Sequence, residues 1–383
     1  MRVSASPCPP PFNVGPNNPD NSINWSQFEP ISASQFWNTG NRLPYAESYN
    51  FSLQRQFGAA TLLSMSYVGT QGHRLLSMEA FNLGDPALCL SVSQLSQVTD
   101  GVTCAPYGED GIYHPISGGT IHSTRYPFGS VFGSNGVMST RGNSNYNSLQ
   151  VTLRHAVGRR EFLAGYTFSK SLDNASGDGN GTGDTINPVN PRIMKALSAF
   201  DVTHNFVVSY NYRIPFDKLG HPNRLTTGWS ISGIARFATG FPVYLTEPDD
   251  HSLLGATGAS AQLDRPNRLP GSLNITDPRK ADPSTLTNPY FNTSLFTREE
   301  IGQYGNSSRR FFHGPGWNNW DMSLSKDLRL TESKNLQFRA EFFNIFNHAQ
   351  FPLPNGNILN STFGFVTSAN APRIGQLGMK FIF

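Results

Sequence analysis

The sequence predicts an all-β protein, namely an antiparallel transmembrane β-barrel, or part of one, with about nine long strands. Three observations predict it. Apolar and polar residues alternate along several segments, these segments are long for strands, and the links between them are alternately short and long. The composition agrees, because 28 Phe and 13 Tyr stand among 36 Gly and 27 Pro, and helix formers rarely occur in runs.

The first strand is expected over residues 45–57, with the sequence YAESYNFSLQRQF. Aromatic and aliphatic residues such as Tyr49, Phe51 and Leu53 occupy odd positions, and small polar residues occupy most even positions. A tilted membrane strand needs about 9 to 11 residues, whereas strands of soluble domains have about 5 to 6. The length of this segment therefore favours a membrane strand as much as its alternation does.

Eight further segments repeat this pattern. They are residues 61–74, 145–155, 161–169, 202–214, 228–238, 318–328, 336–346 and 376–383. The last segment, QLGMKFIF, places Met379, Phe381 and Phe383 on one face and ends the chain on an aromatic residue, so we expect a strand that is buried to its last atom.

The connections between these segments predict the topology. Short links at 58–60, 156–160, 215–227 and 329–335 alternate with long links at 75–144, 170–201, 238–316 and 347–372. Outer-membrane barrels have short periplasmic turns and long extracellular loops, and a soluble meander has no reason to keep this parity. We therefore interpret residues 45–383 as a segment of the barrel and residues 1–44 as an extracellular loop or linker entered in the middle of a domain.

Polar strand faces are expected to point into a lumen and aromatic faces into lipid. Lys326 and Arg55 fall on the apolar side near strand ends, where long side chains reach the interface. An aromatic girdle is expected from residues near strand ends, namely Tyr45, Phe57, Trp229 and Trp320. A soluble sandwich or propeller remains the alternative, and strand length and loop parity favour the barrel over it.

Charge and hydropathy exclude several classes of protein. The formal net charge is +3 with only 14% charged residues, which predicts no nucleic-acid partner. No run approaches the roughly 18 apolar residues of a membrane helix, and the first 20 residues lack the apolar region of a secretory signal. The mean hydropathy of −0.36 fits a soluble protein and a barrel equally well.

Cys89 and Cys104 flank one polar loop, and Cys8 lies far from both. In an oxidising compartment the pair is expected to form a disulfide, whereas in a reducing one both would remain free thiols. The assignment of a disulfide between Cys89 and Cys104 therefore depends on export.

No motif predicts an enzyme, a cofactor or a metal site. The segment SGDGNGTGD at 176–184 resembles the start of an EF-hand loop, but Val189 stands where the loop needs a glutamate, so a flexible surface loop is favoured. The nine histidines show no ligand spacing, and no Gly-x-Ser-x-Gly elbow is present. His155 and His204 lie near strand ends, where interfacial or solvated roles suffice.

Two groups of side chains have a functional and a structural interpretation. Arg339 and Glu341 lie on the lumen face, where solvation or mutual pairing is favoured over contact with a plug or a solute. The aromatic residues Phe311, Phe312 and Trp317 could contact a ligand, but packing within a loop or girdle is favoured.

Several segments resemble one family. The quoted stretches SYVGTQGHRL, YTFSKSLDNAS, GPGWNNWDMSLSKDL and RAEFFNIFNHAQF are similar to the C-terminal barrel of Oar-like, OmpA-related TonB-dependent outer-membrane transporters. They occur in the expected order between about Arg42 and Phe383. The ending also resembles the signal read by the barrel-assembly machinery, with Gln376, Gly378, Phe381 and Phe383 as its residues.

The resemblance implies a receptor in the bacterial outer membrane that takes up a bulky, unknown ligand with energy from the TonB system. Full-length members are expected to have a signal peptide, a plug and 22 strands, so the chain is expected to be the C-terminal part of a longer transporter. The expected partners are outer-membrane lipid, the barrel-assembly machinery, the extracellular ligand and, through the missing N-terminal part, the TonB system. Two alternatives remain open: an adhesion or structural barrel without transport, and a secreted glycan-binding β-rich module.

Overall fold

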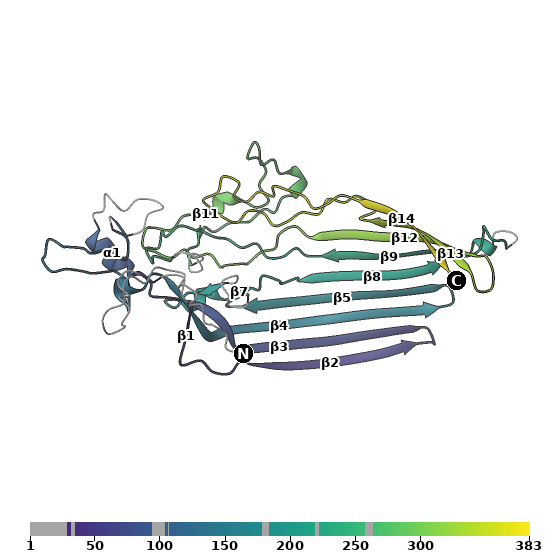
Figure 1. Cartoon of the computed structure of the whole chain (residues 1–383), viewed down its shortest axis with the longest axis horizontal. Helices are drawn as coiled ribbons and strands as arrows, with labels where there is room; N and C mark the ends of the chain where they lie inside the picture. The colour runs from purple at the N-terminus through teal and green to yellow at the C-terminus, as the bar shows by residue number, and fades with distance from the viewer. Residues whose placement is uncertain are drawn as a thin grey trace, which may run out of the picture.

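The computed structural model describes residues 29–31, 35–93, 104–105, 107–177, 184–218, 222–256 and 263–383. One large sheet of long antiparallel strands dominates the chain (Figure 1). Short turns join the strands at one end of the sheet, here called the turn end, and long segments gather at the other end, here called the loop end.

The prediction of nine long antiparallel strands is confirmed within the described residues. Their order in the sheet is β14-β13-β12-β9-β8-β5-β4-β3-β2, so each strand pairs with its neighbours in the chain. The strands are β2 (Tyr45–Phe57), β3 (Thr61–Phe81), β4 (Asn135–Val157), β5 (Arg160–Asp173), β8 (His204–Arg213), β9 (Trp229–Ala238), β12 (Trp317–Arg329), β13 (Asn335–Phe343) and β14 (Ile374–Ile382).

The remaining elements are short and lie mostly at the loop end (Figure 1). The short strands are β1 (Gln35–Trp37), β6 (Thr185–Ile186), β7 (Ala196–Leu197), β10 (Asn267–Arg268) and β11 (Phe296–Thr297). The helices are α1 (Pro86–Val92) and the 3-10 turns η2 (Gly129–Val131), η3 (Pro191–Met194), η4 (Phe216–Lys218), η6 (Pro278–Lys280) and η7 (Thr293–Leu295). Within the described ranges, no helix has the length and apolar character to cross a membrane.

Glycine closes the two tightest turns. Gly58 follows β2 with a φ of 60°, and Gly158 follows β4 with a φ of 58°. This left-handed conformation costs other residues energy but is readily adopted by glycine. Both turns therefore reverse the chain within two or three residues, as the sequence predicts for the short links.

The pairing register of the strands places apolar residues beside apolar residues on one face of the sheet and polar residues beside polar residues on the other. One apolar row crosses six neighbouring strands through Leu53, Met65, Val151, Tyr166, Phe206 and Phe237. One polar row crosses six strands through Glu161, Asn211, Ser232, Ser323, Glu341 and Gln376. Because side chains alternate along a strand, a single register keeps every strand's apolar residues on the same face.

The link predicted at 75–144 is shorter than expected, because β3 continues to Phe81 and β4 begins at Asn135. A span of 21 residues in β3 is roughly 70 Å long, far more than a bilayer requires. The extension lacks alternation because both of its faces are buried, as the consecutive residues Ser77, Met78, Glu79 and Ala80 show; β6 continues the sheet beside it by pairing with Met78 and Glu79. Alternation marks a strand only where its two faces meet different surroundings.

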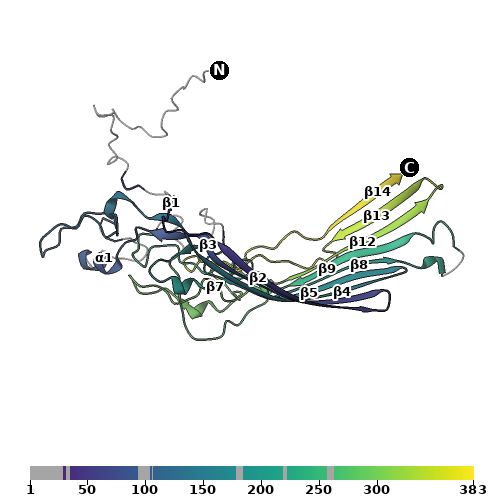
Figure 2. The same cartoon turned by 90° about the horizontal axis from the view of Figure 1, so that it is seen from below.

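The sheet is curved and open. Seen in Figure 2, it bends along its width, and β2 and β14 form its two edges. Within the described residues, neither β2 nor β14 pairs with a second long strand on its outer side. Strand Gln35–Trp37 lies in the segment interpreted as a linker, where it pairs in parallel with β4; the division at residues 44 and 45 stays a prediction.

The hydrophobic core of the described chain lies at the loop end, not in the sheet. Its largest cluster is formed by Val243, Leu245, Tyr290, Phe291, Leu295, Phe296, Phe312 and Val366. These residues come from the links between β9 and β12 and between β13 and β14. The long links thus fold into a packed layer, here called the loop cluster, that covers one end of the sheet.

Candidate ligand-binding site

A cavity of about 1000 Å³ opens within the loop cluster. Its walls come from β1, from the ends of β3 and β4, and from three long links. The aromatic and aliphatic side chains that line it include Phe36, Trp37, Phe81, Tyr126, Phe128, Phe132, Leu254 and Tyr304. Concave, mostly apolar pockets of this size are typical of binding sites for small organic ligands.

Aromatic contacts fix the shape of this cavity. The Phe36 ring lies 5.4 Å from the Phe132 ring, edge to face, and 6.0 Å from the Phe81 ring. Phe128 contacts both Phe81 and Phe132 at ring distances of 5.4 and 5.5 Å. Since each ring has only two side-chain torsions and is held by its neighbours, the surface is preorganised for contact.

Polar groups lie at one side of the cavity. Arg141 of β4 forms an ion pair with the buried Glu79 of β3, and both line the pocket. Asp85 caps α1 by accepting hydrogen bonds from the backbone N–H groups of Ala87 and Leu88 at 2.9 and 3.1 Å. An apolar ligand that carries a polar or charged group fits this combination.

The long links at 75–144 and 238–316 meet at the cavity. Tyr126 and Phe128 come from the first, and Leu254 and Tyr304 come from the second. The sequence could not name these residues, because their proximity arises from contacts between segments more than 100 residues apart. Phe311 and Phe312 instead pack in or against the largest core cluster, which agrees with the structural interpretation.

Buried ion pairs connect the loop cluster to the sheet at the loop end. Arg309 has no exposed surface and donates to Asp173 of β5 at 2.7 Å and also to Asp184. Arg310 donates to Asp184 at 2.8 Å. Burial tends to raise the pKa of Asp184, but the two guanidinium groups outweigh it and hold that pKa below its usual value.

Cys89 and Cys104 are paired in the structure, with their Cα atoms 5.5 Å apart and both residues fully buried. They lie in a small core with Ala105, Tyr113 and Leu253. The disulfide assignment stays a prediction, which this geometry supports. Most of the segment compared with an EF-hand loop, residues 178–183, lies outside the described residues.

The polar face of the sheet carries its own cavity, of about 590 Å³, near the turn end. Arg159, Asp217 and Arg339 are among its lining residues. Arg339 lies 3.6 Å from Glu341, and Gln376 donates to Glu341 at 2.5 Å. The mutual pairing favoured from the sequence is therefore present.

Residues predicted at the apolar strand ends lie as expected. The Lys326 ammonium lies 5.4 Å from the Trp229 ring and donates to backbone carbonyls of the 214–228 link, including that of Arg224 at 2.7 Å. The Arg55 guanidinium lies 5.1 Å from the Phe57 ring. His155 stacks on Phe162. These contacts agree with interfacial roles.

The four residues of the predicted assembly signal lie on or directly after β14. Phe381 and Phe383 lie on one face of the strand, with their ring centroids 5.9 Å apart and the rings stacked. Gln376 and Gly378 lie on the opposite face. Phe383 is 90% exposed, so the fold of the described chain does not bury it. The role of these residues in assembly stays a prediction.

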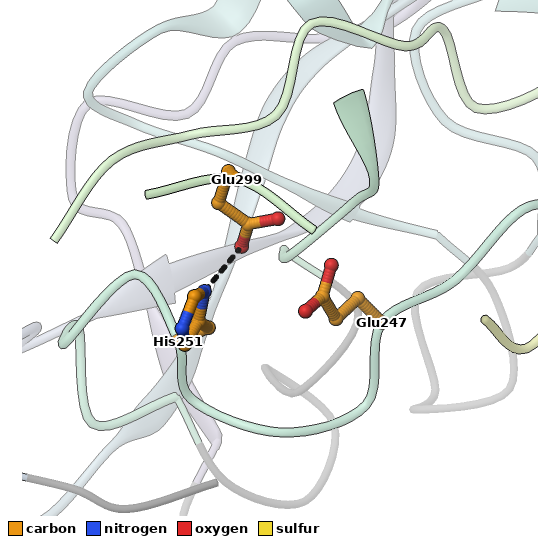
Figure 3. Close-up of side chains that lie close together, drawn as sticks. All are labelled: Glu247, His251 and Glu299. Carbon is orange, nitrogen blue, oxygen red and sulfur yellow. Dashed lines mark ion pairs between the residues drawn. The ribbon is translucent and has the colours of Figure 1, made fainter. Parts of the chain in front are cut away.

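A group that the sequence analysis missed lies in the link between β9 and β12. Glu247, His251 and Glu299 are buried together (Figure 3). Burial and the neighbouring Glu247 raise the pKa of Glu299, and burial with nearby carboxylates raises the pKa of Asp264 to about 7. The four-residue spacing of Glu247 and His251 is the one signal in the sequence, and it is weak outside a helix.

Comparison with known proteins agrees with the fold. The family described as outer membrane beta barrel domain matches residues 3–376. The chain belongs to this family. Membership places the chain in the outer membrane and rules out the secreted soluble module kept open from the sequence.

Solved structures of transporters are similar to this member of the family at low identity. The outer membrane transporter YddB from Escherichia coli is 10% identical, with 92% of this chain and 34% of that chain covered and a TM-score of 0.45. The FrpB iron transporter from Neisseria meningitidis is 13% identical, with 91% and 33% covered and a TM-score of 0.40. The chain thus spans about a third of their length. No curated protein matches the chain.

Proposed function

We propose that this chain forms the C-terminal portion of an Oar-like TonB-dependent outer-membrane receptor that takes up a bulky ligand. The observation that carries the proposal is the aromatic cavity, which three long links and β1 build at the loop end. In this proposal the loop end faces the outside of the cell, the turn end faces the periplasm, and the polar face of the sheet lines the transport path.

The geometry of the sheet supports the proposal that the described strands form part of a barrel wall rather than a closed barrel. Both edge strands have one side without a long partner among the described residues, and unpaired backbone groups in lipid cost several kcal/mol each. Further strands of the same protein would supply these hydrogen bonds, together with a plug that contacts TonB. Sequencing the gene upstream of Met1 tests this part, since a continuous frame with more strands and a plug is expected, and a promoter directly before Met1 would contradict it.

The ligand is expected to be largely apolar, with a group that the Glu79 and Arg141 pair recognises. The intact protein should be purified from outer membranes of its host, and molecules that it retains should be identified by native mass spectrometry. Trp37→Ala and Phe128→Ala are expected to reduce retention at least tenfold, because both rings line the cavity. Trp317→Ala is the matched control, since this tryptophan lies outside the cavity.

Uptake distinguishes a receptor from an adhesion barrel. Cells that lack TonB should fail to accumulate the identified molecule while still binding it at the surface. Equal accumulation with and without TonB would overturn the energised transport, and loss of cell attachment without any uptake defect would favour the adhesion barrel.

A further inference from the structure

Three side chains with metal-binding atoms converge inside the loop cluster (Figure 3). Glu247 and His251 come from the start of the link between β9 and β12. Glu299 lies in the second half of the same link, shortly after β11. One ligand atom from each lies within 4.8 Å of the others, and all three residues are buried. This group lies outside the cavity proposed for the ligand.

Glu247 is oriented by a neighbouring cation. Arg298 donates from Nε to Glu247 Oε1 at 2.5 Å, and its other arm pairs with Asp249. Among the described residues, no hydrogen-bond donor reaches the second oxygen, Glu247 Oε2. A carboxylate that is held through one oxygen and presents the other is the usual arrangement of a metal ligand with its supporting contact.

Glu299 is a buried carboxylate that accepts no hydrogen bond from the described residues. Its side chain is 1% exposed, and in the described part of the chain no donor reaches either carboxylate oxygen. The His251 Nδ1 atom lies 3.9 Å from Glu299 Oε1; this contact, dashed in Figure 3, is an ion pair when His251 is protonated, but it is too long for a hydrogen bond. A buried carboxylate that accepts no hydrogen bond is strongly unfavourable in its charged form, so this position favours a proton or a cation.

The spacing of the atoms fits one metal ion. Two atoms that each lie about 2.1 Å from a zinc ion are at most about 4.2 Å apart, so the 3.9 Å between His251 and Glu299 is compatible with shared coordination. The widest separation, within 4.8 Å, closes with side-chain movement of less than about 1 Å. Imidazole favours zinc and its neighbours in the transition series over calcium or magnesium.

We propose that Glu247, His251 and Glu299 bind a divalent transition-metal ion, with Zn²⁺ as the best match. Three protein ligands leave a fourth position for water. The ion would join two stretches of the link about 50 residues apart and thereby brace the loop cluster. The proposal goes beyond ligand uptake and does not depend on it.

The test uses the full 383-residue chain in detergent after removal of metal by a chelator. Zn²⁺, Mn²⁺ and Ca²⁺ are added one at a time, and binding is measured by calorimetry together with the Tm. One Zn²⁺ per chain and a raised Tm are expected. Glu299→Gln and His251→Ala should each weaken Zn²⁺ binding at least tenfold, while Glu300→Gln, which changes the exposed neighbour of Glu299, should bind as the parent does.

The stability of Glu299→Gln without metal separates a metal site from a misfolded variant. Because glutamine has a similar shape and no charge, this variant should be at least as stable as the metal-free parent, and only the metal response should disappear. The proposal is overturned if the parent does not respond to Zn²⁺, if His251→Ala binds Zn²⁺ normally, or if Ca²⁺ alone binds. A parent that ignores every metal would instead indicate that Glu299 and Glu247 share a proton.

Discussion

Arg309 donates to Asp173 Oδ1 across 2.7 Å, from a side chain with no exposed surface. The two residues are 136 positions apart, so this contact joins the link before β12 to the end of β5. Asp184 accepts from the same guanidinium and from Arg310. One buried group of charges therefore helps to hold the loop cluster on the sheet.

Removing the central guanidinium should loosen the loop cluster. We expect Arg309→Met to lower the free energy of unfolding by about 3–5 kcal/mol, because the buried Asp173 carboxylate loses its cation and Asp184 keeps only Arg310. Urea unfolding followed by fluorescence measures the loss. Arg279→Met is the control, since its pair with Asp277 lies at the surface and should contribute nothing measurable. Equal losses in the two variants would contradict this account.

The same group predicts a dependence on pH. Because the folded-state pKa of Asp184 is lowered, its stabilising contribution is complete above the ordinary value of 3.8 and is lost as the pH falls through the folded pKa. The difference in unfolding free energy between the parent and Asp184→Asn should therefore be constant near neutral pH and should shrink below about pH 3.8. A difference that grows on acidification would show the opposite sign and refute the assignment.

The cysteine pair gives a third prediction. Thiol labelling of protein that is unfolded in denaturant but not reduced should leave Cys89 and Cys104 unmodified, and reduction should release both thiols. Closing a loop with a sequence separation of 15 stabilises a fold by about 3 kcal/mol, so Cys89→Ser should lower the stability of the loop cluster by a similar amount. Detection of both thiols before reduction would exclude the disulfide.

The final phenylalanine gives a fourth prediction. Phe383→Ala should reduce the amount of protein assembled in the outer membrane several-fold without lowering the stability of the assembled fraction, because the side chain is 90% exposed. Heat-modifiable mobility in gels measures assembly. Leu377→Ala, also highly exposed on the same face of β14, is the control. A matching defect in that variant would indicate loss of apolar surface rather than loss of a signal.

The strands could be predicted because their two faces meet different surroundings. Tyr45–Phe57 was predicted to the residue, since alternation stops where the glycine turn begins. The extension of β3 past Leu75 could not be predicted, because both of its faces are buried and the alternation disappears. Contacts such as that between Arg309 and Asp184 could not be predicted, because they depend on a fold that brings distant segments together.

The loop cluster holds the described hydrophobic core, while the long strands expose theirs. The two parts are stable in different surroundings. The loop cluster buries its apolar side chains away from water, whereas the long strands need lipid or detergent to cover theirs. A change of detergent should thus shift the melting of the strands and leave that of the loops in place. Calorimetry in two detergents would then resolve two transitions.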